Sequence, residues 1–294
     1  MNSRWMIAQG RTVLTAGAVL AVLLLAGGWL FSHPISVSAN QSVILLPAAM
    51  YHSVTDVGDS PARYVISPSM LESDLQYLQA HGRETVTVRD LLAYVQDGAA
   101  LPEKPVLLTF DDGYYNNYKY AYPLLKQYGM RAVLSPVASL TERFSQTDEA
   151  EQETWSYCTG RELREMADSG VFEIQNHSYD FHELKPRKGC LRMAGETAAA
   201  YRQCFLSDTR RAQDLFVSLG IEAPVCYTYP YGAVNAEAQA LTAVCGFAVT
   251  LGCEEGVTAL TRDTACLKGI RRNNRDGRWS SAQFWDALLA QTEG

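Results

Sequence analysis

Two adjacent carboxylates follow an apolar, strand-like run. The run from Val106 to Phe110 leads directly into Asp111, Asp112 and Gly113. Successive side chains of a strand point to opposite faces, so the two carboxylates can converge only if the chain leaves strand geometry there, which Gly113 permits. A divalent cation would relieve their repulsion, with one carboxylate as ligand and the other as a base toward a water that the cation activates. The plain alternative is a strand that ends in an Asp-Gly turn.

Two histidines, His177 and His182, lie five residues apart. A regular helix would rotate them about 140° from one another, and a strand would place them on opposite faces. They can therefore share a cation only from a curled loop; the plain alternative is a solvated pair. Two histidines and a carboxylate with one open position form a catalytic zinc site, although cobalt, nickel or iron(II) accept the same donors. We expect a divalent metal, zinc first, held by His177, His182 and one of the two aspartates.

Strand and helix patterns alternate seven or eight times along the chain. Helix N-termini are indicated at Ser67-Pro68, Thr87, Thr159 and Ser280. Strands are expected at 43–50, 85–88, 106–110, 132–135, 172–175, 226–229, 247–250 and 267–270. This alternation favours a parallel sheet in a closed or nearly closed βα barrel, whose chemistry gathers at the carboxyl ends of the strands. Polar groups follow several of these predicted strand ends: His52, Asp111, Asp112, His177, His182, 229–232, Arg271 and Arg272.

Three motifs together resemble the metal-dependent polysaccharide deacetylases (carbohydrate esterase family four). They are Thr109-Phe-Asp-Asp-Gly113, His177-Ser-x-x-x-His182 and Tyr229-Pro-Tyr-Gly232. The resemblance extends from Leu46 to about Asn274. It implies a distorted (β/α) barrel of seven or so parallel strands that removes N-acetyl, or less often O-acetyl, groups from a polysaccharide. It also implies Asp111 as the general base and Asp112, His177 and His182 as metal ligands, a division of roles that the residues alone leave open.

The sequence departs from the commoner family pattern at three places. The histidine pair is spaced i, i+5, which resembles the branch with the biofilm poly-N-acetylglucosamine deacetylases. Thr228 stands where an arginine usually orients the base, so Arg271 or Arg272 is expected to substitute. The late histidine that usually protonates the leaving amine is missing, because no histidine follows His182. His52 is therefore expected to act as the general acid or as a partner of the substrate and base, with a core histidine as the plain alternative.

The remaining site residues concern the substrate. We expect substrate contacts from Tyr114, Tyr229, Pro230, Tyr231, Gly232 and Arg272. With the usual arginine and acid absent, a membrane-tethered saccharide-binding pseudoenzyme is the main competing hypothesis. Non-haem iron oxygenases share the two-histidine-one-carboxylate set, but they do not need a second carboxylate, and the βα alternation disfavours their usual all-β scaffold.

Charge and the N-terminus bear on partners and location. The net charge of −7 argues against a nucleic-acid partner. Arg4 and Arg11 precede an uncharged run from Val13 to Phe31, which favours an uncleaved membrane anchor that leaves the rest of the chain outside the cytoplasm. Cleavage near 37–39 would instead give a secreted protein. We therefore divide the chain into an anchor or signal with linker at 1–40 and a catalytic domain at 41–294, facing the outside of the plasma membrane.

Seven cysteines lie between positions 158 and 266, and none forms a Cys-x-x-Cys pair. A zinc–thiolate or redox motif is therefore not indicated. In an oxidising compartment we expect some of these thiols to pair, with Cys190–Cys204 and Cys253–Cys266 as the candidates.

Overall fold

The computed structural model describes residues 43–57, 61–147 and 151–292. The expected anchor, cleavage site and linker, and the division of the chain near residue 40, lie outside these residues. Within the described ranges, no helix combines the length and the apolar character needed to cross a membrane.

The fold is built around strand β6 (Pro105–Asp112), which is buried along its whole length. It pairs in parallel with β2 (Ala48–Tyr51) on one side, and with β5 (Glu84–Val86) and β7 (Ala132–Pro136) on the other. Strand β7 continues the sheet to β8 (Phe172–Ile174), again in parallel. A run as apolar as Val106–Phe110, interrupted only by Thr109, is typical of a parallel strand covered on both faces.

The parallel pairings continue around a ring. A bridge between Asn176 and Tyr227 joins the end of β8 to β9 (Cys226–Thr228), which pairs with β10 (Val249–Leu251). A second bridge, between Leu251 and Ile270, leads to β12 (Asn273–Asn274), which pairs with β2. The predicted α/β fold with a parallel central sheet is thus confirmed, and single bridges at two junctions make the ring irregular.

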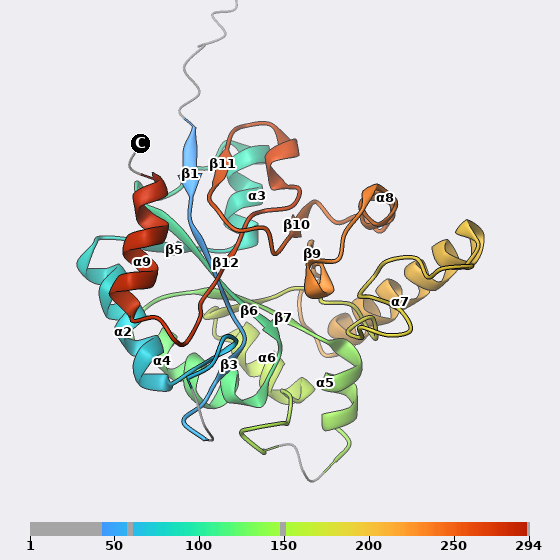
Figure 1. Ribbon diagram of the computed structural model, residues 1–294, viewed down its shortest axis with the longest axis horizontal. Helices are drawn as coiled ribbons and strands as arrows, with labels where there is room; N and C mark the ends of the chain where they lie inside the picture. Colours follow the sequence, from blue (N-terminus) through green and yellow to red (C-terminus); the bar gives the residue numbers. More distant parts are fainter. Residues whose placement is uncertain (1–42, 58–60, 148–150, 293–294) are drawn as a thin grey trace, which may run out of the picture. The chain divides into compact units, whose positions relative to one another are not determined.

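Four helices cover the outer face of β6: α2 (Pro68–Ala80), α4 (Tyr122–Gln127), α6 (Gly160–Asp168) and α9 (Ser281–Leu289). Figure 1 shows them around the central strands. Val106, Leu108 and Phe110 pack with apolar side chains of these helices. Leu107 belongs instead to an inner cluster with Val133 and other strand residues. This alternation defines an inner face of β6. Thr109 and Asp111, two and four residues after Leu107, share that face.

The remaining helices are α3 (Val88–Asp97), the π-helical turn η1 (Asn117–Ala121), α5 (Ala138–Phe144), α7 (Ala198–Ser218) and α8 (Ala236–Val244). The remaining strands are β1 (Ile44–Leu46), β3 (Ser53–Val54), β4 (Val65–Ile66) and β11 (Thr258–Leu260), and short 3₁₀ turns lie at Pro230–Gly232, Thr264–Leu267 and Ala290–Thr292. All four predicted N-caps are confirmed, because the side chains of Ser67, Thr87, Thr159 and Ser280 accept backbone N–H groups of their helices.

The structure differs from the predicted elements in three places. The strand expected at 43–50 breaks at Pro47, which has no N–H to donate, so β1 pairs antiparallel with β11 while β2 pairs with β6. A 3₁₀ turn and a single bridge stand where a strand was expected at 267–270. The segment 137–158, where no strand or helix start was predicted, contains helix α5.

The expected disulfides are absent, since all seven cysteines, which lie within the described residues, carry free thiols. Cys190 is buried and its thiol donates to the carbonyl of Ala233, whereas Cys204 is exposed. The Cys253 thiol lies 3.8 Å from the sulfur of Met50. Sequence spacing alone could not decide these pairs, because it says nothing of where each thiol points.

Candidate active site

The end of β6 brings its two carboxylates together by a change of backbone conformation. Asp112 has a φ of 70° and Gly113 a φ of 77°. A side chain at Gly113 would place its Cβ 2.5 Å from the Cβ of Pro136, so the turn also requires a glycine for space. Asp111 stays on the inner face of β6, and the left-handed residue after it turns Asp112 away from the outer face that strand alternation would give it.

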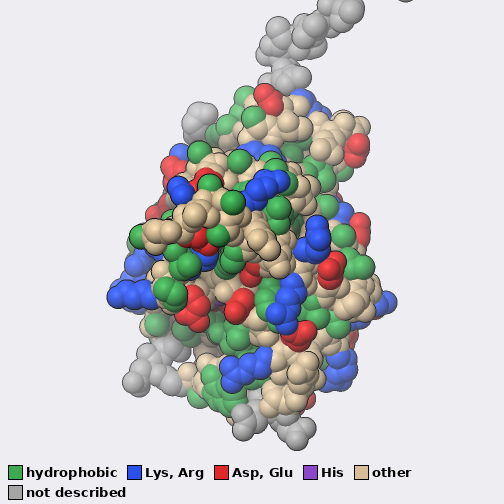
Figure 2. Space-filling view, turned by 90° about the vertical axis from the view of Figure 1, so that its right-hand side faces the viewer, with side chains coloured by type: hydrophobic (Ala, Val, Ile, Leu, Met, Phe, Trp, Pro, Cys, Tyr) green, Lys and Arg blue, Asp and Glu red, His purple; other side chains and the backbone are tan. Residues whose placement is uncertain are grey.

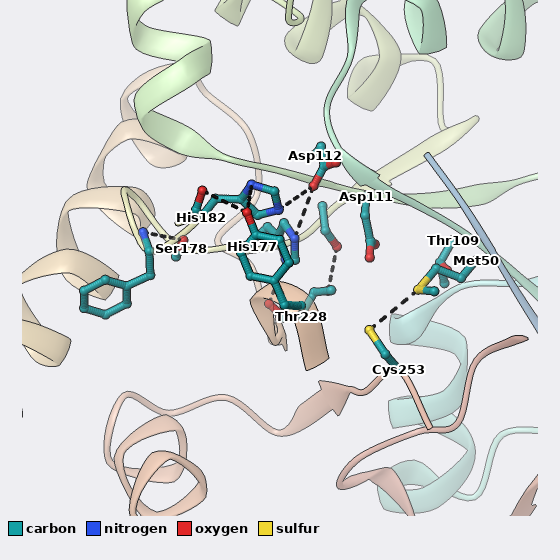
Figure 3. A network of polar contacts seen from close by, with 12 residues as sticks. Met50, Thr109, Asp111, Asp112, His177, Ser178, His182, Thr228 and Cys253 are labelled. Carbon is teal, nitrogen blue, oxygen red and sulfur yellow. Dashed lines mark hydrogen bonds and ion pairs between the residues drawn. The ribbon is translucent and has the colours of Figure 1, made fainter. Parts of the chain in front are cut away.

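Asp112, His177 and His182 offer three ligand atoms that lie within 4.8 Å of one another. Oδ1 of Asp112 is 3.4 Å from Nε2 of His177 and 3.0 Å from Nε2 of His182, as Figure 3 shows. The other ring nitrogen of His177 lies 2.8 Å from the carbonyl of Thr228, a distance at which it must carry the proton and donate it. The Nε2 lone pair of a neutral His177 therefore faces a carboxylate oxygen, a repulsive contact that a cation between them would make favourable.

A second observation supports the same conclusion. Oδ1 of Asp112 is buried and accepts no hydrogen bond of acceptable geometry from the described residues. A buried carboxylate oxygen without a donor is costly, and a metal ion satisfies it. The residues therefore fit a divalent cation.

The histidines lie on a curled loop, as their spacing predicted. Ser178 has a φ of 72° and donates its N–H to the side chain of Asn176. From helix α7, the carboxylate of Asp208 accepts the N–H groups of Tyr179 and Asp180 at 2.9 and 2.8 Å. Burial raises the pKa of Asp208 to about 6, although both N–H groups favour the ionised form. The loop between the two histidines is thus held from both sides.

Arg272 holds Asp111. Its guanidinium donates to both carboxylate oxygens, at 2.7 and 2.9 Å, and its Nε donates to the carbonyl of Gly252. Burial would raise the pKa of Asp111, but Arg272, together with His177 and His52, outweighs burial and keeps that pKa below its usual value. Arg272 is fully buried and occupied by Asp111, so its side chain has no exposed surface for the substrate contact that the sequence suggested.

His52 lines a cavity of about 410 Å³ together with Asp111, Asp112, His177 and His182. Asn117 donates to the carbonyl of His52. In the adjoining strand β3, the Asn116 side chain donates to the hydroxyl of Ser53 and accepts the N–H of Val54. Burial lowers the pKa of His52, opposed by the nearby carboxylates. Nδ1 of His52 is buried and has no hydrogen-bond partner among the described residues. His52 is therefore not a core histidine whose polar groups are all satisfied, which was the alternative considered from the sequence.

The residues expected to bind substrate fall into two groups. Tyr114 and Tyr231 line the cavity, and the Tyr231 ring stacks on His182 with centroids 4.6 Å apart. Tyr229 and Pro230 are buried, and the Tyr229 hydroxyl pairs with Thr242 inside the fold. Gly232 lies so close to Cys253 that an added Cβ would be 2.7 Å from its Cβ. Tyr229, Pro230 and Gly232 thus shape the turn. The φ of 58° at Tyr231 directs its ring toward the cavity.

Sequence reasoning missed the residues that support the site from outside it. Asp208 gave no signal, because its partners lie 28 and 29 positions away in the chain and its helix is otherwise ordinary. Asn116 and Asn117 could have been noticed as two neighbouring amides four and five positions after Asp112, and both are fully buried. Sequence alone does not show which side chains are buried.

The ring of parallel strands gathers the two carboxylates and the two histidines at the carboxyl ends of its strands, an arrangement typical of α/β barrel enzymes. A model of the polysaccharide deacetylase family matches residues 98–250, more than half of the 294 residues. The chain belongs to this family, as its motifs predicted, and is a polysaccharide deacetylase hydrolase.

Among curated proteins, the chain is similar to YxkH of Bacillus subtilis, which is named as a polysaccharide deacetylase. The two are 27% identical over 227 residues, and the match covers 77% of this chain and 71% of YxkH. It is 27% identical over 175 residues to a poly-β-1,6-N-acetyl-D-glucosamine N-deacetylase of Staphylococcus aureus, covering 58% of this chain. The match spans 55%, about half, of the Staphylococcus protein.

Solved structures support the fold. A deacetylase of Streptococcus pyogenes, PplD, solved in complex with acetate, aligns with a TM-score of 0.68 at 18% identity, covering 86% of this chain and 100% of that one. IcaB from Ammonifex degensii aligns with a TM-score of 0.66 at 24% identity, covering 85% and 98% of the two chains.

Proposed function

We propose that the protein removes N-acetyl groups from an acetylated glucosamine polymer outside the cytoplasm. Its cofactor is a divalent metal, for which zinc is the first candidate. The observation that carries this proposal is the meeting of Asp112, His177 and His182 beside the carboxylate of Asp111 in one cavity. The polymer is suggested by the name of the Staphylococcus relative and by the histidine spacing. The location rests on the N-terminal apolar run and its flanking arginines.

Asp112, His177 and His182 would hold the metal, which supplies Lewis-acid activation of the acetyl carbonyl and a lowered pKa for water. Asp111 accepts the proton of the water that attacks the acetyl carbon, and Arg272 keeps that carboxylate ionised and fixed in direction. The backbone N–H of Tyr114, directly after the Gly113 turn, is our candidate for stabilising the oxyanion.

His52 then donates a proton to the amine nitrogen as the C–N bond breaks, which yields acetate and a free amine. A lowered pKa makes the protonated form of His52 a stronger acid toward that nitrogen. Tyr231 lies on His182 at the cavity wall, where its ring can pack against the sugar that carries the acetyl group.

The pseudoenzyme hypothesis depended on a missing arginine and a missing acid. Arg272 contacts Asp111 from a different strand end, and His52 lines the cavity, so the chain offers a candidate residue for each role. A nucleic-acid partner is disfavoured by the negative net charge. On the face in Figure 2, acidic and basic side chains are interspersed without a large basic patch.

The test is acetate release from β-1,6- and β-1,4-linked N-acetylglucosamine oligomers. The proposal predicts release from the β-1,6 series, loss of release with a chelator, and recovery with zinc or cobalt. Release that is insensitive to chelation, or binding of the oligomers without any release, would contradict it.

A further inference from the structure

We propose that a second cavity beside the catalytic one binds a neighbouring sugar of the same polymer, with Trp279 as its stacking platform; this inference rests on the proposed function. The second cavity measures about 330 Å³, and the catalytic cavity about 410 Å³. Arg63, Glu255 and Asn274 line both cavities. A bound chain can therefore pass from one to the other along a shared wall, and each volume is within the range of small-ligand pockets, about 300 to 1,000 Å³.

The second cavity offers an apolar surface in a polar setting. Trp279 lines it with 47% of its surface exposed. An indole ring provides a flat apolar face for the C–H side of a sugar ring, while polar groups around it can bond the hydroxyls. Asn274 and Gln291 supply such groups on the same walls. The exposed tryptophan is thus explained as a contact surface for a sugar unit.

The loop that carries Trp279 is fixed in advance. Arg275 is buried beneath it and donates to the carbonyls of Asp276 and Trp279 at 2.7 and 2.9 Å. Arg275 is itself held by the buried carboxylate of Asp74, at 2.8 Å. Gly277 donates to the carbonyl of Ala62, and a Cβ there would lie 2.1 Å from a backbone oxygen of the same segment. A surface ordered before binding loses less entropy when the ligand arrives.

Asn274 points to a ligand independently. Its Nδ2 donates to the carbonyl of Arg63, but its Oδ1 is buried and accepts no hydrogen bond from the described residues. A buried acceptor without a donor costs free energy that a ligand can recover. A sugar hydroxyl or an acetamido N–H at the junction of the two cavities would satisfy it.

The charges favour a neutral unit. Two cations, Arg63 and Arg278, and two carboxylates, Glu255 and Asp276, line the second cavity. Arg278 donates to Asp276 at 2.8 Å. The formal charges therefore balance, and a strongly anionic glycan gains nothing from this surface. An acetylated hexosamine, with hydroxyls and an uncharged amide, matches it.

The experiment compares Trp279→Ala with the unchanged full-length chain, loaded with zinc, on an N-acetylglucosamine pentamer and on a single-sugar acetamide. We expect the KM for the pentamer to rise about two- to tenfold, with kcat and the single-sugar kcat/KM unchanged. Trp279→Phe should keep most of the affinity. An unchanged KM for the pentamer, or equal losses on both substrates, would overturn the inference.

Acetate release by the unchanged protein tests the proposed function. The ratio of the pentamer KM values of Trp279→Ala and the unchanged protein tests this inference. If no acetate is released, titration calorimetry of the pentamer still tests the second cavity. Tighter binding to the unchanged protein than to Trp279→Ala would support it, and equal binding would reject it. Matching thermal unfolding curves verify that both proteins are folded.

Discussion

The guanidinium of Arg272 and the carboxylate of Asp111 form a two-pronged ion pair, with nitrogen–oxygen distances of 2.7 and 2.9 Å. The residues are 161 positions apart, and both side chains are almost completely buried. An arginine fork fixes a carboxylate in direction as well as in charge. The pair therefore keeps Asp111 ionised and directed into the cavity, while Asp112 remains available to the proposed metal.

Replacing Arg272 with methionine should damage both activity and stability. The buried carboxylate would lose its partner, so we expect a loss of about 3 to 5 kcal/mol in the free energy of unfolding. Misplacement of the base should lower kcat about a hundredfold or more. Denaturant titration and acetate release measure the two effects.

The matched controls are Arg272→Lys and the double variant Arg272→Met with Asp111→Asn. Lysine keeps the charge but not the fork, so it should recover more stability than activity. The double variant should be more stable than Arg272→Met alone, because no unpaired buried charge remains. A single variant as stable and active as the unchanged protein would show that the pair has no role.

Replacing His52 with glutamine should affect substrates according to their leaving group. An amine must be protonated to leave, whereas an activated phenol leaves without help. We expect a loss of about a hundredfold or more on an N-acetyl amide and little change on an aryl acetate. Steady-state kinetics on both substrates, with zinc content measured in parallel, provide the test. Equal losses on both substrates would exclude His52 as the general acid.

Replacing Asp208 with alanine should weaken metal binding without touching a ligand. The side chain holds the backbone between the two histidines through the N–H groups of Tyr179 and Asp180. Supporting residues of this kind are typically worth about ten- to a hundredfold in metal affinity or activity. Competition with a chelator measures the zinc affinity. Asp214→Ala is the matched control, because Asp214 is an exposed aspartate on the same helix α7; equal affinities of the two variants would contradict the prediction.

The sequence was informative where a local pattern determines geometry. The Asp-Asp-Gly turn, the curled histidine loop and the N-caps follow from backbone and capping rules that act over a few residues. Parallel pairing then gathers the strand ends. The choice of Arg272 over Arg271 could not be made, because it depends on which of two neighbouring side chains points inward. Arg272 turns toward Asp111, whereas Arg271 is exposed and pairs with Glu254.

The expected substrate contacts also depended on side-chain direction, which the sequence does not show. Aromatic residues next to a strand end look alike in sequence, yet Tyr229 is buried and Tyr231 reaches the cavity. A single left-handed residue, Tyr231, makes this difference. Trp279 lies in a loop of the last thirty residues and carries no motif, so the proposed sugar contact rests on the cavity that it lines and not on the sequence.

The central claim is that Asp112, not Asp111, joins His177 and His182 around one cation. It is tested most directly by zinc bound per chain in the unchanged protein, Asp111→Asn and Asp112→Asn, with acetate release assayed on the same samples. We predict about one zinc in the unchanged protein and in Asp111→Asn, little in Asp112→Asn, and no acetate from either variant. Full zinc content in Asp112→Asn, or undiminished acetate release by Asp111→Asn, would contradict the account.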